Sequence, residues 1–177
     1  MTTEFLAPAT SVRTQPRLRL RSNEVVDGGR LRTAQRSGIL GYGGLDVSPS
    51  LEWSGAPLGT LSYAVTACDI DGRCHWAVAD ISGGVTSLVV DAGNGLGERL
   101  PSVARQLRNH LGMERYVGPA PANLGLPGRF IFAVHAVNVG RLPLSAHAGP
   151  AELTAALDCH AVGRATLTAA YGWTPPR

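Results

Sequence analysis

The sequence predicts a mainly β fold, an antiparallel β-sandwich formed by a single domain. The expected strands follow one another in runs and do not alternate with helices, which favours antiparallel sheets over βαβ units. The chain carries 22 Gly and 12 Pro, so many turns between short elements are expected. Its 177 residues suffice for one hydrophobic core, and its 44% hydrophobic composition excludes a disordered chain.

Residues 1–16 are polar, contain two Pro and show no periodicity, so we expect a flexible N-terminal arm before a domain at 17–177. Seven of the sixteen Arg lie in the first 36 residues, as in a nucleic-acid-binding arm. No aromatic residue interleaves with these Arg, and Glu24 and Asp27 interrupt them. Because a stacking platform is missing, no nucleic-acid partner is expected.

The first half of the domain reads as strands separated by turns. Leucines alternate with arginines over residues 17–21, and a short strand is expected at 51–53. Residues 61–67 alternate clearly and run into the turn 69–72, Asp-Ile-Asp-Gly. Residues 75–81 return as another strand, so the turn joins two neighbouring strands.

The second half contributes two short peripheral helices and two strands. Apolar residues at steps of four predict an amphipathic helix over residues 101–111. Pro150 at a first helical position opens a second helix through about His160. Residues 130–139 are bulky on both faces and predict a central strand, and residues 165–173 a closing strand.

Cysteine usage and hydropathy give expectations about the compartment. There are three Cys, an odd number, and the N-terminus lacks the pattern of a signal peptide. We therefore expect reduced thiols and a cytoplasmic location. No window of about 18 apolar residues exists, so no membrane span is expected.

Several segments match one family in order. Residues 48–57 read SPSLEWSGAP, and residues 116–121 read YVGPAP. Between them lie Asp-Ile-Asp at 69–71 and Cys-His-Trp at 74–76 followed by Asp80. This order resembles the phosphatidylethanolamine-binding protein family, in its bacterial, Raf kinase inhibitor-like branch, over residues 17–173.

The resemblance implies an antiparallel β-sandwich with a small, anion-accepting pocket near one end. The pocket residues it implies are Asp69, Asp71, His75, Gly118, Pro119 and Tyr171. Where the family has His-Arg-Tyr entering the central strand, this chain has Gly128, Arg129 and Phe130. Gly128 and Phe130 therefore predict a roomier, less cationic pocket for a larger, less charged organic ligand.

The residues themselves allow two kinds of chemistry. Asp69 and Asp71 are two apart, so in an extended chain they share a face, where they repel or accept hydrogen bonds. His75 can pair with a carboxylate, then grip an anion as imidazolium or act as a base when neutral. In a purely structural interpretation, Asp69 caps the turn and His75 satisfies a buried carboxylate. The spacing matches no zinc or calcium pattern, so neither metal nor cofactor is expected.

Three functions remain open from the sequence. The first is binding of a small organic or weakly anionic ligand around Asp69, Asp71 and His75. The second is a cofactor-independent biosynthetic enzyme, a cyclase or isomerase, in which the same three residues transfer protons. The third is a protein–protein regulator. The expected partner is a small-molecule ligand or biosynthetic intermediate, and a homodimer is left open.

Overall fold

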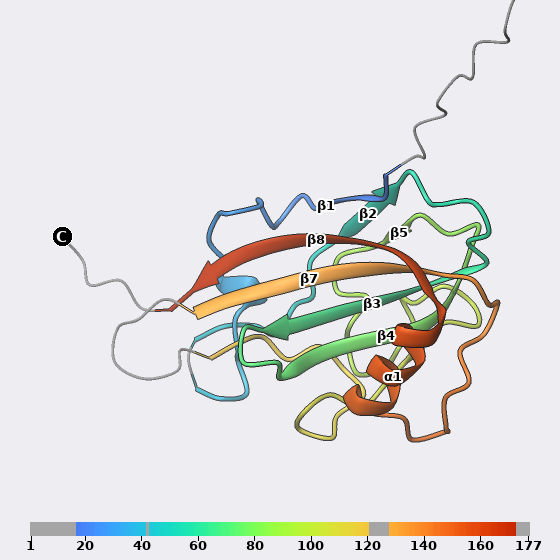
Figure 1. Ribbon diagram of the computed structural model, residues 1–177. Helices are drawn as coiled ribbons and strands as arrows, with labels where there is room; N and C mark the ends of the chain where they lie inside the picture. The colour runs from blue at the N-terminus through green and yellow to red at the C-terminus, as the bar shows by residue number, and fades with distance from the viewer. Residues whose placement is uncertain (1–16, 42, 121–127, 173–177) are drawn as a thin grey trace, which may run out of the picture.

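The computed structural model describes residues 17–41, 43–120 and 128–172. These residues form two antiparallel sheets and one α-helix (Figure 1). The strands are β1 Arg19–Arg21, β2 Leu51–Ser54, β3 Ser62–Asp69, β4 Cys74–Ser82, β5 Ser87–Leu88, β6 Arg105–Gln106, β7 Gly128–Val137 and β8 Ala161–Tyr171. The helix is α1 Pro150–His160, and a 3-10 turn, η1, spans Thr33–Gln35. The predicted arm at 1–16 lies outside the described residues.

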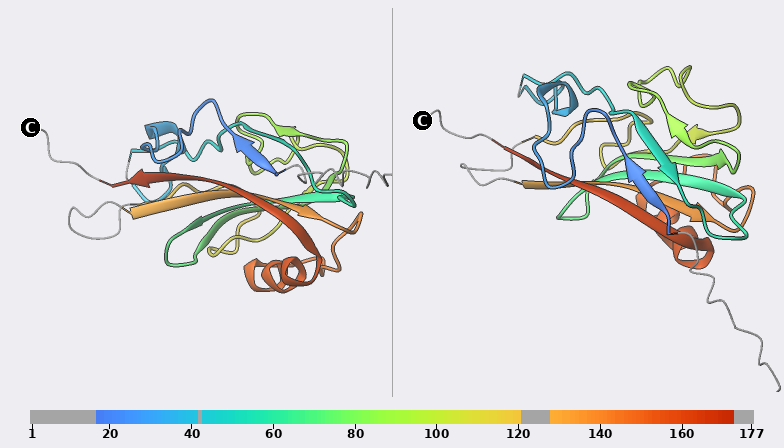
Figure 2. Two further views of the ribbon diagram at one scale, coloured as in Figure 1. Left: turned by 45° about the horizontal axis from the view of Figure 1, so that its top comes forward. Right: turned by 90° about the horizontal axis from the view of Figure 1, so that it is seen from above.

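The larger sheet has five strands in the order β6-β4-β3-β7-β8, and the smaller has three in the order β1-β2-β5. Figure 2 shows the smaller sheet on one side of the larger one and α1 on the other. Strand β7, predicted as a central strand, lies between β3 and β8 inside the sheet, and β3 takes the middle position. The predicted sandwich therefore takes the form of two unequal sheets, because β1, β2 and β5 are short.

Two hydrophobic clusters follow from this layering. The first lies between the sheets, where Trp53 of β2 meets Tyr63 of β3, and it includes the fully buried Phe132 of β7. The second lies between the five-stranded sheet and α1, where Leu153 and Leu157 pack against small residues of β3 and β4. Strands β3 and β4 are buried on both faces, which explains why their sequences are apolar almost throughout.

One of the two predicted helices is correct. Helix α1 begins at Pro150, as the sequence indicated, and its first turn also carries Glu152. The helix predicted for residues 101–111 is wrong. The backbone there bonds to the edge of β4: Leu107 N–H donates to the Ala77 carbonyl at 2.9 Å, and β6 pairs with β4. Val103, with φ of 68°, also cannot continue a helix.

Strand β4 carries two bulges. Between the pairs Ala67–Trp76 and Cys68–Cys74 the register advances one residue on β3 and two on β4, so His75 is the extra residue. A second shift lies between the pairs of Tyr63 and Val65, where Asp80 has a φ of 60°. Because a bulge redirects a side chain, these shifts decide where His75 and Asp80 point.

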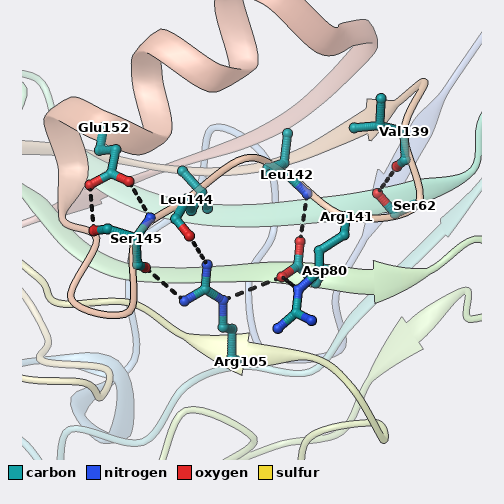
Figure 3. Close-up of polar contacts among 9 residues, drawn as sticks. All are labelled: Ser62, Asp80, Arg105, Val139, Arg141, Leu142, Leu144, Ser145 and Glu152. Carbon is teal, nitrogen blue, oxygen red and sulfur yellow. Dashed lines mark hydrogen bonds and ion pairs between the residues drawn. The ribbon is translucent and has the colours of Figure 1, made fainter.

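The Asp80 bulge fixes the connection between β7 and α1 (Figure 3). Its buried carboxylate lies 3.3 Å from Arg105 Nε and 3.5 Å from Arg141 Nε, and it accepts the Leu142 N–H at 2.9 Å. Arg105 in turn donates to the carbonyls of Leu144 and Ser145, and the Ser145 hydroxyl donates to Glu152 at the start of α1. Asp80 therefore has a structural role in this connection.

Candidate ligand-binding site

Asp69, the last residue of β3, organises the turn into β4. Its Oδ1 accepts the Arg73 N–H at 2.8 Å, and its Oδ2 lies 3.5 Å from the Arg73 guanidinium. Backbone bonds close the same turn, in which Gly72 has a φ of 82°. The Asp69 side chain is 2% exposed, so a carboxylate is held at the buried end of the strand. Asp69 therefore caps the turn, as the structural interpretation of the sequence expected.

Asp71 does not share this buried position. Its side chain is 60% exposed and lies 4.0 Å from the Arg73 guanidinium. The expectation that the two carboxylates share one face is therefore wrong. The chain leaves the extended conformation at the turn, so the alternation that would place Asp71 beside Asp69 ends there.

His75, the bulged residue of β4, is held by one ring nitrogen. Its Nδ1 lies 3.0 Å from the Val117 carbonyl, which can only accept, so Nδ1 carries the hydrogen. Its Nε2 faces the Asp69 carboxylate at 3.6 Å, beyond hydrogen-bond length. Among the described residues this buried Nε2 has no hydrogen-bond partner. The pair therefore presents two acceptors side by side with no hydrogen between them.

Electrostatics keep His75 neutral near pH 7. Burial lowers the pKa of His75, and the neighbouring His110 lowers it further. The Val117 carbonyl and the Asp69 carboxylate raise the pKa without reversing the net direction. A bound anion next to a buried, neutral imidazole favours its protonated form, because the negative charge stabilises the imidazolium.

The ring of His110, to which the sequence assigned no role, lies against His75. The two ring centroids are 4.4 Å apart, and His110 donates its backbone N–H to the Cys74 carbonyl at 2.8 Å. The half-buried ring lies within hydrogen-bond distance of that carbonyl through Nδ1, at 2.9 Å. Sequence reasoning missed His110 because it placed the residue on a helix, whereas this segment pairs with β4. A second histidine is thus present, from a different position than the family pattern suggests.

Aromatic side chains continue the site. Phe130 lies 5.0 Å from the His75 ring and 6.1 Å from the Tyr171 ring, between centroids. Phe130 is also the cross-strand partner of Asp69. Burial raises the pKa of the Tyr171 hydroxyl, and the charges of Asp69 and Asp71 raise it further. The structure therefore brings Asp69, His75, Phe130 and Tyr171 to one end of the five-stranded sheet.

Gly128 does not open the space that the sequence predicted. It is the cross-strand partner of Tyr171, and a Cβ built on it would lie 2.3 Å from the Tyr171 Cζ. The phenol ring therefore covers the glycine, as aromatic residues often do across a β-ladder. The prediction of open space next to His75 is therefore wrong at position 128. A histidine at 128 would have to displace Tyr171.

Gly118 and Pro119 are buried and directly follow Val117, whose carbonyl contacts His75. The Gly118 N–H donates to Asp46 Oδ1 at 2.8 Å, and the Pro119 carbonyl accepts the Ser37 N–H at 3.2 Å. A Cβ on Gly118 would lie 2.3 Å from the Arg36 carbonyl carbon. This close packing fixes the preceding carbonyl, that of Val117, which orients His75. Asp46 was not predicted from sequence.

Two further kinds of site are absent from the part of the chain that the structure describes. No group of three or more His, Cys, Asp or Glu there is placed to hold a metal ion. No helix within those ranges is long and apolar enough to cross a membrane.

The two facing sheets and the polar cluster at one end of the larger sheet define a class of mainly β protein, and comparison with known proteins gives its family. The family model described as phosphatidylethanolamine-binding protein matches residues 21–172. The chain therefore belongs to the phosphatidylethanolamine-binding protein family.

Bacterial relatives agree with this assignment. The UPF0098 protein YbcL of Escherichia coli is 36% identical over 155 residues, 85% of each chain. YbhB of the same organism is 32% identical over 159 residues, which is 87% of this chain and 99% of YbhB. The crystal structure of YbcL superimposes with a TM-score of 0.85 at 34% identity, covering 89% of this chain and 99% of YbcL. The homologue CT736 of Chlamydia trachomatis, at a TM-score of 0.73 and 23% identity, shares the fold over 90% of this chain and 99% of its own.

Proposed function

We propose that this protein binds a small organic or weakly anionic ligand at the Asp69–His75 pair. The observation that carries the proposal is the buried His75 Nε2, 3.6 Å from the Asp69 carboxylate and without a hydrogen-bond partner in the described ranges. Leaving a buried polar group unsatisfied costs about 1–3 kcal/mol. A ligand that supplies the missing hydrogen bonds recovers that cost on binding.

The charges at the site select the ligand's protonation state. His75 gains a proton when it donates to an anion, whereas the adjacent Asp69 repels a second negative charge. A group that accepts one hydrogen bond and donates another suits both residues. Monoprotonated phosphate and phosphate monoesters have this character, and the family description supports a phosphate-bearing probe. The Phe130 ring, whose centroid lies 5.0 Å from that of His75, supports an apolar portion beside that group.

The proposal predicts that phosphate binding strengthens as the pH falls. Because the pKa of His75 is lowered in the free protein, the ring is neutral at pH 7.5 and must take up a proton on binding. Between pH 7.5 and 5.5 both this ring and the phosphate become easier to protonate. We expect the dissociation constant for inorganic phosphate, measured by calorimetry, to fall by about tenfold or more over that range.

Two substitutions of His75 separate its nitrogens. His75→Asn keeps an N–H near the Nδ1 position, where it can donate to Val117, and removes Nε2. His75→Gln reaches the Nε2 position but cannot take up a proton. We expect His75→Asn to weaken phosphate binding at pH 5.5 by about 10–100-fold, the value of a charged hydrogen bond. His75→Gln should bind weakly and with a smaller pH dependence than wild type, because only the phosphate still titrates over this range. Equal phosphate binding by wild type and His75→Asn at pH 5.5 would show that Nε2 does not bind the phosphate.

The same geometry supports the enzyme alternative, because a neutral imidazole with a free Nε2 beside a buried carboxylate is the resting state of a general base. In a cyclase or isomerase of this kind, Asp69→Asn keeps the shape and removes the charge. Turnover of the substrate should then fall by about 10²–10⁴-fold, with a much smaller change in affinity. Product formation by Asp69→Asn at the wild-type rate would exclude Asp69 from such a mechanism.

A further inference from the structure

Two cysteines face each other across the hairpin that carries the site. Cys68 of β3 and Cys74 of β4 are cross-strand partners, one pair inward from the turn. Opposed Cα atoms in antiparallel strands lie about 4.5–5.5 Å apart, inside the range of about 4.4–6.8 Å that a disulfide spans. Both are free thiols in this structure. Bond formation therefore needs rotation of side chains and little movement of the backbone.

The two thiols line a hollow that is separate from the Asp69–His75 pair. This hollow has a volume of ≈ 560 Å³ and lies between α1 and the five-stranded sheet. Thr66, His135 and Arg164 line it beside the cysteines. Cys68 is half-buried and Cys74 is buried, so a small reagent in the hollow meets Cys68 first.

The surroundings divide the pair into a nucleophile and its partner. The hydrogen bond from the Cys74 thiol lowers the pKa of Cys68, and the positive charge of Arg164 adds to this against burial and Asp69. The pKa of Cys74 is raised, first by that same hydrogen bond and then by burial. Cys74 Sγ also lies 3.3 Å from the Trp76 carbonyl. Cys68, the more accessible of the two cysteines, is therefore the one that loses its proton more readily, as a reactive cysteine requires.

We propose that Cys68 and Cys74 form a reversible dithiol–disulfide pair that hydrogen peroxide oxidises. The Cys68 thiolate attacks one peroxide oxygen, the O–O bond breaks, and Cys68 sulfenic acid and hydroxide form. Cys74 then attacks the sulfenic sulfur; the S–S bond forms, and the Cys74 proton leaves with the sulfenic oxygen as water. Two sulfurs each lose one electron, and the peroxide is reduced to hydroxide and water.

Each cysteine directly precedes a residue of the ligand site. Cys68 precedes Asp69, and Cys74 precedes His75, while the Cys74 carbonyl accepts the His110 N–H. A covalent bond between the cysteines therefore restrains the backbone segments that carry the carboxylate and both histidines. If the proposed function is correct, oxidation changes the affinity for inorganic phosphate, and reduction restores it.

The test uses the full chain with Cys159→Ser, because Cys159 is exposed and would react on its own. After treatment with hydrogen peroxide, intact-mass measurement should show a loss of about 2 Da, from the two hydrogens removed. Peptide mapping should join Cys68 to Cys74, and dithiothreitol should reverse the change. Adding Cys68→Ser or Cys74→Ser to this background should abolish the mass loss.

The outcomes distinguish the dithiol from the ligand site. A gain of about 32 Da at Cys68 without a link, or two thiols still free after treatment, would overturn the proposed disulfide. The mass readout does not involve a ligand, so it stands whatever the phosphate titration gives. A disulfide that forms while phosphate affinity stays the same in both redox states would overturn the coupling to the site alone.

Discussion

The free energy of unfolding is expected to fall by about 3 kcal/mol as the pH falls from 6.5 to 4, because His135 is buried in its neutral form. Burial and, to a smaller extent, the charge of Arg164 together lower the pKa of His135 to about 4. Below pH 6.5 the unfolded chain binds a proton at this residue and the folded chain does not. The contribution of His135 to the free energy of unfolding is therefore fully present above pH 6.5. It decreases as the pH falls, until the ring in the folded protein also takes up a proton near pH 4.

Urea unfolding at pH 7 and at pH 4.5 measures this effect, and the slope against pH is the readout. His135→Gln keeps a polar group near the Thr66 hydroxyl, which His135 Nε2 approaches at 3.2 Å, and removes the titration. We expect its stability to depend much less on pH than that of wild type. His147→Gln, at an exposed position, is the matched control and should follow wild type. An equal slope for His135→Gln and wild type would contradict the assignment.

Gly118→Ala is expected to destabilise the fold by about 3 kcal/mol, at the upper end for overpacking, because the added methyl meets backbone and not a side chain that can rotate. Its Cβ would lie 2.3 Å from the Arg36 carbonyl carbon and 2.4 Å from the Gln35 carbonyl oxygen. Separation of the two segments would also strain the bond between Gly118 N–H and Asp46. The Val117 carbonyl would then hold His75 less firmly, so phosphate binding should weaken as well.

Gly84→Ala is the matched control for this substitution. A Cβ on Gly84 has no heavy atom within 4 Å, and the residue is exposed without a positive φ. Thermal unfolding of the two variants should give a clear loss for Gly118→Ala and almost none for Gly84→Ala. Similar midpoints for both would show that the segment around Arg36 moves aside without cost.

Local patterning predicted the fold where the strand is paired on both sides. Residues 61–67 and 130–139 read as strands because they alternate or are apolar on both faces, and they became β3 and β7. Residues 101–111 also carry an apolar period of four, but their backbone bonds to the edge of β4. That pairing is a tertiary effect between distant segments, so no local period could reveal it.

The site was predicted only in part, because several of its contacts also depend on how strands pair with one another. The nearness of Asp69 and His75 follows from a short hairpin, which the sequence shows directly. The outward position of Asp71, the bulge at His75 and the arrival of His110 each depend on backbone geometry between strands. Gly128 also appeared vacant in sequence, because the covering ring comes from Tyr171 on the neighbouring strand.

The most direct test of the central claim is ¹⁵N NMR of the His75 ring in the free protein and with inorganic phosphate at pH 6.5. We expect a hydrogen on Nδ1 and none on Nε2 in the free protein, because the Val117 carbonyl accepts from Nδ1. Added phosphate should protonate Nε2 and shift its resonance to the value of an imidazolium nitrogen. An Nε2 atom that already carries a hydrogen in the free protein would contradict the claim that this nitrogen is the binding atom. An Nε2 resonance that does not shift when phosphate is added would contradict it as well.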